Sequence, residues 1–265
     1  ARVGTLANPV NPLLAPLGNY GGPTPTYALL PGSLAIDAGS GRTTTIDQRG
    51  IAAVGVRDIG AFESRGFVLT PLSNSTPQNT NLTLPFSQPL GVTVSSLFGE
   101  PVANGVITFT APISGASANL SSLTATIDNK GQASITANAN TIPGAYTVIA
   151  NATGATDVSF NLSNSLFNVI TVDQLLDVID NNLTPGNVSL REAVAYSAPN
   201  AIINFSPLIS GGTINLTSGL LVIGPDLTLN NLNTNITAST PLTFGSVILG
   251  NNVALSSTAT GTGIL

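Results

Sequence analysis

The chain has 265 residues, of which 42% are hydrophobic and only 7% are charged, and its formal net charge is −5. An average soluble domain carries roughly 25% charged residues, so uncharged polar side chains supply most of the polarity here. His and Cys are absent, which excludes disulfides, thiolate and imidazole metal sites and nucleophiles that need a His base, and the acidic balance argues against a nucleic-acid partner.

Residues 1–66 are rich in Pro and Gly and hold short apolar clusters without a sustained period. This composition predicts irregular loops and short strands that wrap over another part of the protein. Charged residues of alternating sign lie close together there: Asp47, Arg49, Arg57, Asp58 and Glu63. We expect a local ion-pair network in which Arg49 or Arg57 bridges carboxylates. A calcium site is the alternative, and the two Arg would compete with the cation.

Residues 67–163 show period-two alternation of apolar and polar residues in run after run, for example at Leu90, Val92 and Val94. Turn sequences such as Asp128-Asn129-Lys130-Gly131 separate the runs. About seven short strands at this spacing are typical of an antiparallel sandwich of immunoglobulin type.

Residues 164–200 carry the helical signals. Ser189-Leu190-Arg191-Glu192 is a capping box, in which the Ser189 hydroxyl accepts from the Glu192 amide while the Glu192 side chain reaches back. It predicts a short helix, ended by Pro199, that covers a sheet edge. Thr171 and Gln174 form a second pattern of this kind, which favours another helix over 171–180.

Three acids of the same segment, Asp173, Asp177 and Asp180, have Arg191 as their one nearby cation. Calcium prefers carboxylate oxygens, and a single nearby cation leaves these acids as a candidate calcium site. The alternative is a solvated acidic helix face or loop. No other cofactor is expected.

Residues 201–265 return to short β runs separated by Gly, Asn and Ser-Thr clusters, as in Thr213-Ile214-Asn215-Leu216. This spacing suits coils of a parallel β-helix, in which each coil stacks on the previous one at roughly 4.8 Å.

Two motifs resemble the ends of one class of solenoid. Asp47-Gln48-Arg49-Gly50 with Asp58-Ile59-Gly60-Ala61-Phe62-Glu63 resembles the closing segment of bacterial surface proteins with right-handed parallel β-helices, of the "choice-of-anchor" type. Residues 187–196 resemble the CSLREA-type opening cap of the same class. Residues 90–109 resemble the Ig-like modules of invasin-type adhesins.

The resemblance implies an organisation in four parts: the closing part of a β-helix at 1–66, an Ig-like sandwich at 67–163, an opening cap at 164–200 and β-helix coils at 201–265. It also implies an extended segment with an acidic loop at 171–180, in place of a helix. The expected fold is therefore all-β, with short right-handed parallel β-helix segments at both ends, an antiparallel Ig-like β-sandwich and one or two short capping helices.

A closing cap that precedes an opening cap suggests assembly rather than chemistry. We expect a structural subunit or repeat of an extracellular bacterial filament, whose copies join head-to-tail by completing a β-helix across the unit boundary. Separate subunits and one covalent tandem repeat are both open, and the absence of Met favours the repeat or a processed chain. The expected joining residues are Leu13, Leu14, Leu29, Leu30, Val247, Ile248, Leu249, Ile264 and Leu265.

Two other functions remain as alternatives. A cell-surface adhesin would bind glycans or a host surface, and clustering of Tyr20, Tyr27 and Tyr196 on one exposed face would support it. A polysaccharide-active β-helix enzyme is less favoured, because Asp226 is the single charged residue after Glu192. We expect no enzyme activity and, since no apolar run is long enough, no membrane span.

Overall fold

The computed structural model describes residues 9–40, 46–223, 227–231, 234–238, 242–244 and 248–249, the last two ranges by their backbone alone. The chain divides into two compact units. The first takes in the described residues up to Thr80 together with Pro85–Ala139 and Gly144–Ser163. The second takes in Asn81–Leu84, Asn140–Pro143 and the described residues from Asn164 onward.

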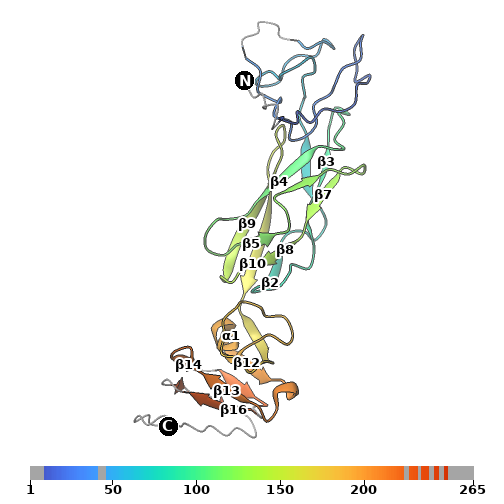
Figure 1. Cartoon of the computed structure of the whole chain (residues 1–265). Helices are drawn as coiled ribbons and strands as arrows, with labels where there is room; N and C mark the ends of the chain where they lie inside the picture. Colours follow the sequence, from blue (N-terminus) through green and yellow to red (C-terminus); the bar gives the residue numbers. More distant parts are fainter. Residues whose placement is uncertain are drawn as a thin grey trace. The chain divides into compact units, whose positions relative to one another are not determined.

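A β-sandwich forms most of the first unit (Figure 1). One sheet has the strand order β1-β3-β7, a second has the order β2-β10-β9-β4-β6, and β5 and β8 form a small separate pair. The strands are β1 Val68–Pro71, β2 Gln78–Asn81, β3 Leu90–Ser95, β4 Val106–Thr110, β5 Ala118–Leu120, β6 Thr124–Thr126, β7 Gln132–Ile135, β8 Ala137–Ala139, β9 Gly144–Asn151 and β10 Val158–Ser165.

Alternation of side chains explains why these sequences form two layers. Along β10, Val158, Phe160 and Leu162 are buried while the residues between them face outward. They share one core with β3, where Val92 is fully buried, and with β4, where Phe109 is nearly so. The pairs β1–β3, β3–β7, β4–β6, β4–β9 and β5–β8 are antiparallel. The all-β prediction is confirmed, and the layout is that expected of an Ig-like module.

Residues 9–40 and 46–66 differ from the closing coils that were expected of them. Their isolated bridges, at Leu14–Leu29, Gly18–Thr26 and Ile46–Ala52, are antiparallel, and the described part of this segment forms no parallel ladder. The segment instead packs on the sandwich and shares its hydrophobic core. The Val106 amide donates to the Pro31 carbonyl at 2.9 Å, and the Gly32 amide donates to the Thr153 carbonyl at 3.2 Å. We call residues 9–40 and 46–66 the N-terminal segment.

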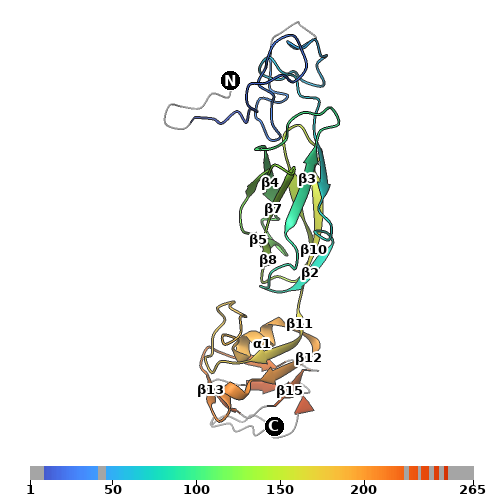
Figure 2. The same ribbon diagram turned by 90° about the vertical axis from the view of Figure 1, so that its right-hand side faces the viewer.

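The second unit is built from parallel ladders. Its elements are β11 Phe167–Val172, α1 Leu190–Tyr196, β12 Ser197–Phe205, the 3-10 turn η1 Pro207–Ile209, β13 Thr213–Leu216, β14 Leu221–Ile223, β15 Thr228–Asn230, β16 Asn235–Ala238, β17 Leu242–Phe244 and β18 Ile248–Leu249. One sheet has the order β11-β12-β15-β18, and β13–β16 and β14–β17 form two more parallel pairs. Figure 2 shows β11, β12 and β15 side by side.

From β12 onward the chain visits three sheets in turn, since each strand from β15 to β18 pairs with the strand three places earlier. Ile203, Ile214 and Ile223, one from each sheet, are fully buried in the core of this unit. Outward-facing polar residues stack as well: the Asn230 side-chain amide donates to the Asn204 side-chain oxygen at 3.0 Å. Short β runs with one inward apolar row therefore suffice to build this stack.

The predicted capping box is confirmed. Ser189 precedes α1, accepts from the Glu192 amide, and receives the Glu192 side chain on its own amide. The second helix, predicted over 171–180, is wrong. β11 runs to Val172, and residues 173–180 form a loop without regular structure. An extended segment followed by an acidic loop, as the resemblance implied, describes this part of the chain.

Candidate functional site

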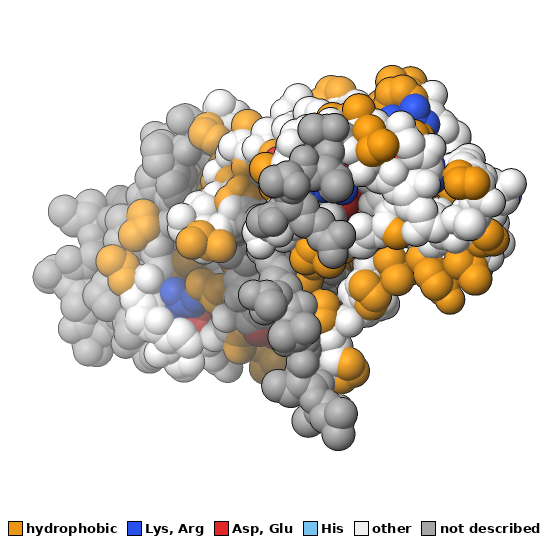
Figure 3. Space-filling view, turned by 90° about the horizontal axis from the view of Figure 1, so that it is seen from above, with side chains coloured by type: hydrophobic (Ala, Val, Ile, Leu, Met, Phe, Trp, Pro, Cys, Tyr) orange, Lys and Arg blue, Asp and Glu red, His pale blue; other side chains and the backbone are white. Residues whose placement is uncertain are grey.

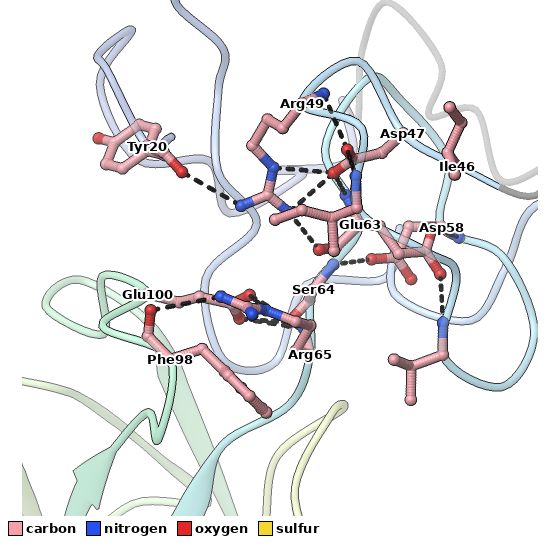
Figure 4. Close-up of polar contacts among 12 residues, drawn as sticks. Tyr20, Ile46, Asp47, Arg49, Asp58, Glu63, Ser64, Arg65, Phe98 and Glu100 are labelled. Atoms are coloured by element: carbon pink, nitrogen blue, oxygen red, sulfur yellow. Dashed lines mark hydrogen bonds and ion pairs between the residues drawn. The ribbon is translucent and has the colours of Figure 1, made fainter. Parts of the chain in front are cut away.

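The charged residues of alternating sign between positions 47 and 63 form a buried polar cluster in the N-terminal segment (Figure 4). The Asp47 carboxylate accepts from the Arg49 side chain at 2.8 Å and from the Glu63 amide at 3.0 Å. Arg49 donates onward to the Glu63 carbonyl at 2.6 Å, and its guanidinium carbon lies 3.5 Å from the centre of the Phe62 ring. The Arg49 and Asp47 side chains are almost completely buried.

Hydrogen bonds to the buried Asp47 carboxyl group favour its charged form. Burial alone would raise the pKa of Asp47, but the amides of Glu63 and Ile51 and the Arg49 side chain outweigh burial and lower the pKa below its ordinary value. The expected ion-pair network is therefore present around Arg49. Arg57, the other candidate, donates to the Ile46 carbonyl at 3.4 Å.

Asp58 and Glu63 are two further buried acids in the same segment. Asp58 accepts from the Asp37 amide at 2.7 Å and from the Ser64 amide at 2.6 Å. Glu63 accepts from the amides of Asp58, at 3.1 Å, and Val54, at 3.3 Å. Burial, together with the nearby Glu63 and Asp37 charges, raises the pKa of Asp58 to about 6 in spite of these donors.

A fourth buried acid, Glu100, was not identified from the sequence. It lies between β3 and β4 of the sandwich and accepts from the Ser64 hydroxyl at 2.9 Å and the Arg65 amide at 3.0 Å. The Arg65 guanidinium carbon lies 3.9 Å from the centre of the Phe98 ring. One signal could have indicated this role: Glu100 is a single acid in a turn otherwise without charge, Phe98-Gly99-Glu100-Pro101. Glu100 thus anchors the end of the N-terminal segment to the sandwich.

In the second unit, Asp177 is the centre of the acidic loop. Its carboxylate accepts from Arg191 at 2.6 Å and from the amides of Thr217 and Ser218, each at 2.7 Å. Arg191 in turn donates to the Gly219 carbonyl at 3.1 Å. Burial would raise the pKa of Asp177, but the Arg191 side chain and the two amides outweigh it and hold the pKa at about 2. The pair ties the loop and α1 to the turn before β14.

The other acids of the cap bind main-chain amides of the loop. Glu192, fully buried, accepts from the amides of Asp180 at 3.0 Å and Asn181 at 2.9 Å in addition to that of Ser189. Asp173 accepts from the amides of Gly186 at 2.6 Å and Val188 at 2.7 Å. Glu192, the acidic residue of the capping box, therefore also holds the acidic loop in place.

The calcium prediction at Asp173, Asp177 and Asp180 gains no support from this geometry. Asp173 and Asp177 each bind a different set of amides, and Asp180 accepts from the Asn182 amide at 2.9 Å. Among the described residues, no group of three or more acidic side chains is placed so that it could hold a metal ion. The donors in this loop are N–H groups, which occupy the oxygens that a cation would need.

The residues expected to join one copy to the next differ in burial, and some of them lie outside the described residues. Leu29 and Leu30 are 2% and 3% exposed within the core of the first unit, so their assignment to an assembly surface is wrong. They fill the end of the sandwich. Leu13 is half-buried against the same core, and Leu14 is exposed. Val247, Ile264 and Leu265 lie outside the described residues, and Ile248 and Leu249 are described by backbone alone, as strand β18.

The tyrosines do not form a common exposed platform. Tyr196 is buried at the end of α1, where its hydroxyl bonds Asn181. Tyr20 packs edge-on against Phe62 at 6.1 Å between ring centres, and Tyr27 is exposed. In the described part of the chain, no helix is long and apolar enough to cross a membrane.

No family model matches the chain, and a search of curated proteins finds no match. Among solved structures, domains 4 and 5 of the S-layer protein SbsC match with 17% identity and a TM-score of 0.28, over 36% of this chain and 50% of that one. The D00-D0 domain of intimin matches with 22% identity and a TM-score of 0.23, over 36% of this chain and 45% of that one. The chain thus spans half or less of each structure, and likenesses this slight carry no argument about fold or function.

Proposed function

We propose that the chain is a structural part of a bacterial cell-surface filament and has no enzyme activity. The buried acids support a structural role over a catalytic one. Each acts as a fixed acceptor for main-chain amides or Arg, as Asp47, Asp58, Glu100 and Asp177 do. A carboxylate held in this way orders loops, and its oxygens are already occupied by donors of the chain itself.

The second unit is, on this proposal, the start of a right-handed parallel β-helix that α1 caps. The observation that carries the proposal is that β16, β17 and β18 stack on β13, β14 and β15, respectively. Among the described strands, each has a hydrogen-bonded neighbour on one side only. An open edge of this kind is a template for another strand. A following coil, supplied by the next repeat or by another copy, would cover it.

The structure changes the surface that the next copy is expected to meet. Since Leu29 and Leu30 are buried, we take as candidates four of the half-exposed apolar side chains of the N-terminal segment: Ile46, Val54, Val56 and Ile59. The Asp58 and Glu63 bonds hold the loop that carries Val54 and Ile59. In the view of Figure 3, apolar and uncharged surface far exceeds charged surface. We call these four residues the apolar loop face and propose it as the apolar part of a head-to-tail contact.

Sedimentation of the intact chain over a wide concentration range tests this contact. We expect association that grows with concentration and is lost in Val56→Asp. Ile113→Asp, at a fully exposed apolar residue of the sandwich, is the matched control and should associate normally. A chain that stays monomeric at every concentration, or equal effects of the two variants, would contradict the assignment.

The mass of native material under strong denaturation separates the two forms of assembly. A species near 26.7 kDa indicates subunits that associate without covalent bonds. A much larger single chain indicates a tandem repeat. The adhesin alternative has no specific support, because Tyr196 is buried and Tyr20 packs on Phe62.

A further inference from the structure

The first strand of the five-stranded sheet, β2, lies at its edge and pairs with the last strand of the sandwich, β10. The two strands run parallel, as three contacts show. Near the start of β2, the Thr76 hydroxyl accepts from the Asn161 amide at 2.8 Å. After its end, the Leu82 amide donates to the Ser165 carbonyl at 3.0 Å, and Asn81 donates to the Leu166 carbonyl at 3.2 Å. Residue numbers therefore rise together along both strands.

This pairing decides how a pull applied between the start of β2 and the end of β10 loads the sandwich. The chain enters β2 at its amino end, near Thr76, and leaves β10 at its carboxyl end, at Ser165. In a parallel pair these two points lie at opposite ends of the ladder. A pull on them slides one strand along the other, so that all hydrogen bonds between the strands are loaded at once instead of one after another.

We infer that the sandwich is a load-bearing module, in which the β2–β10 pair resists stretching of the chain in shear. This function goes beyond filament assembly, because it belongs to a single chain and holds whether or not copies associate. The core strengthens the device, since Val158, Phe160 and Leu162 anchor β10 on the face opposite to solvent. Sliding of β10 would have to withdraw these side chains from a close-packed interior.

Single-molecule force measurements on the full chain can test the inference directly, because the protein holds no Cys. Handles attached through Ser73→Cys and Asn168→Cys load β2 and β10 in shear. Handles attached through Ser73→Cys and Thr156→Cys lie at the same end of the two strands and unzip them. All three positions are exposed. We expect a several-fold higher unfolding force for the shear pair than for the unzipping pair. Equal forces would overturn the inference.

A second comparison uses proline, which lacks the amide that a ladder needs. The Leu82 amide donates to β10. Main-chain amides two residues apart along a strand point the same way, so the Thr80 amide also faces β10. Thr80→Pro should lower the shear force strongly. Ala125→Pro, in the opposite edge strand β6, should lower thermal stability and leave most of the shear force. The inference fails if Thr80→Pro keeps the full shear force, or if both variants lose it in proportion to their stability.

Discussion

Asp177 and Arg191 form a buried ion pair in which the carboxylate oxygen lies 2.6 Å from Nε of the guanidinium. Each partner also binds the main chain before β14: Asp177 accepts from Thr217 and Ser218, and Arg191 donates to Gly219. The pair therefore joins three stretches that are distant in sequence, namely the acidic loop, α1 and the turn after β13.

Removal of one partner should destabilise the second unit strongly. Arg191→Met leaves the Asp177 charge buried without its cation, and breaking such a pair typically costs 3–5 kcal/mol. We expect a loss on the order of 4 kcal/mol in the free energy of unfolding, measured by denaturant titration with hydrogen exchange as a readout for each unit. The double variant Asp177→Asn/Arg191→Met should lose less than Arg191→Met alone. A loss in the double variant equal to the sum of the losses in Asp177→Asn and Arg191→Met would show that the pair contributes no coupling.

The same pair should make the second unit sensitive to strong acid. The pKa of Asp177 is about 2 in the folded chain, below the ordinary value of 3.8. Its contribution is therefore present above pH 3.8 and is lost as the pH falls through 2. The difference corresponds to about 2 kcal/mol. Denaturant titrations between pH 1.5 and pH 5 should show this loss, and Asp177→Asn should remove it.

Asp58 should give the first unit the opposite dependence. Its pKa is about 6, above the ordinary value of 3.8, so the folded state binds the proton more tightly than the unfolded state. Stability is then greatest below pH 3.8 with respect to this group and falls as the pH rises through 6. The change is about 3 kcal/mol by linkage. Asp58→Asn should flatten the profile between pH 4 and pH 7, and an unchanged profile would exclude Asp58 as its source.

Gly32 should be required where the N-terminal segment meets the sandwich. A Cβ atom at Gly32 would lie 2.5 Å from the Val106 carbonyl oxygen, and its φ is +85°. Gly32→Ala should cost about 2 kcal/mol for overpacking in addition to the strain of positive φ. Gly21 is a matched control, since its φ is +89° and a Cβ there would meet nothing within 4 Å. Thermal unfolding of both variants measures the difference, and equal losses would contradict the close approach.

Ser189 should contribute more than an ordinary capping residue. Its fully buried hydroxyl accepts from the Glu192 amide and donates to the Val178 carbonyl, so it joins α1 to the acidic loop. Ser189→Ala should cost about 2 kcal/mol, at the upper end for a lost cap. Ser197→Ala, at the other end of α1, removes a single hydroxyl bond to Ala193 and serves as a control with a smaller loss.

Local patterns in the sequence predicted much of the fold. Alternation located β3, β4, β9 and β10, because one face of each strand is buried. The capping box located α1, because both of its hydrogen bonds form within four residues. The polar cluster around Arg49 was found because its charged residues lie close together in the chain.

Long-range contacts account for what the sequence did not reveal. A helix over 171–180 fails because Asp173 and Asp177 bind amides at 186–188 and 217–218, which a helix would not let them reach. Glu100 lies 36 residues from Ser64 along the chain, so neither residue indicates the other. Leu29 and Leu30 look like open solenoid residues until the sandwich that covers them is known.

The shared core of the first unit also bears on how this protein can change over evolutionary time. Composition marks a boundary at residue 66, but Leu29, Leu30 and Ile36 lie in the same core as Ile107 and Phe109. A recombination event at that boundary would bring together two halves of a core that had diverged separately. Residues 1–66 and the sandwich should therefore be inherited together, and a change of volume in one should be answered by a change in the other.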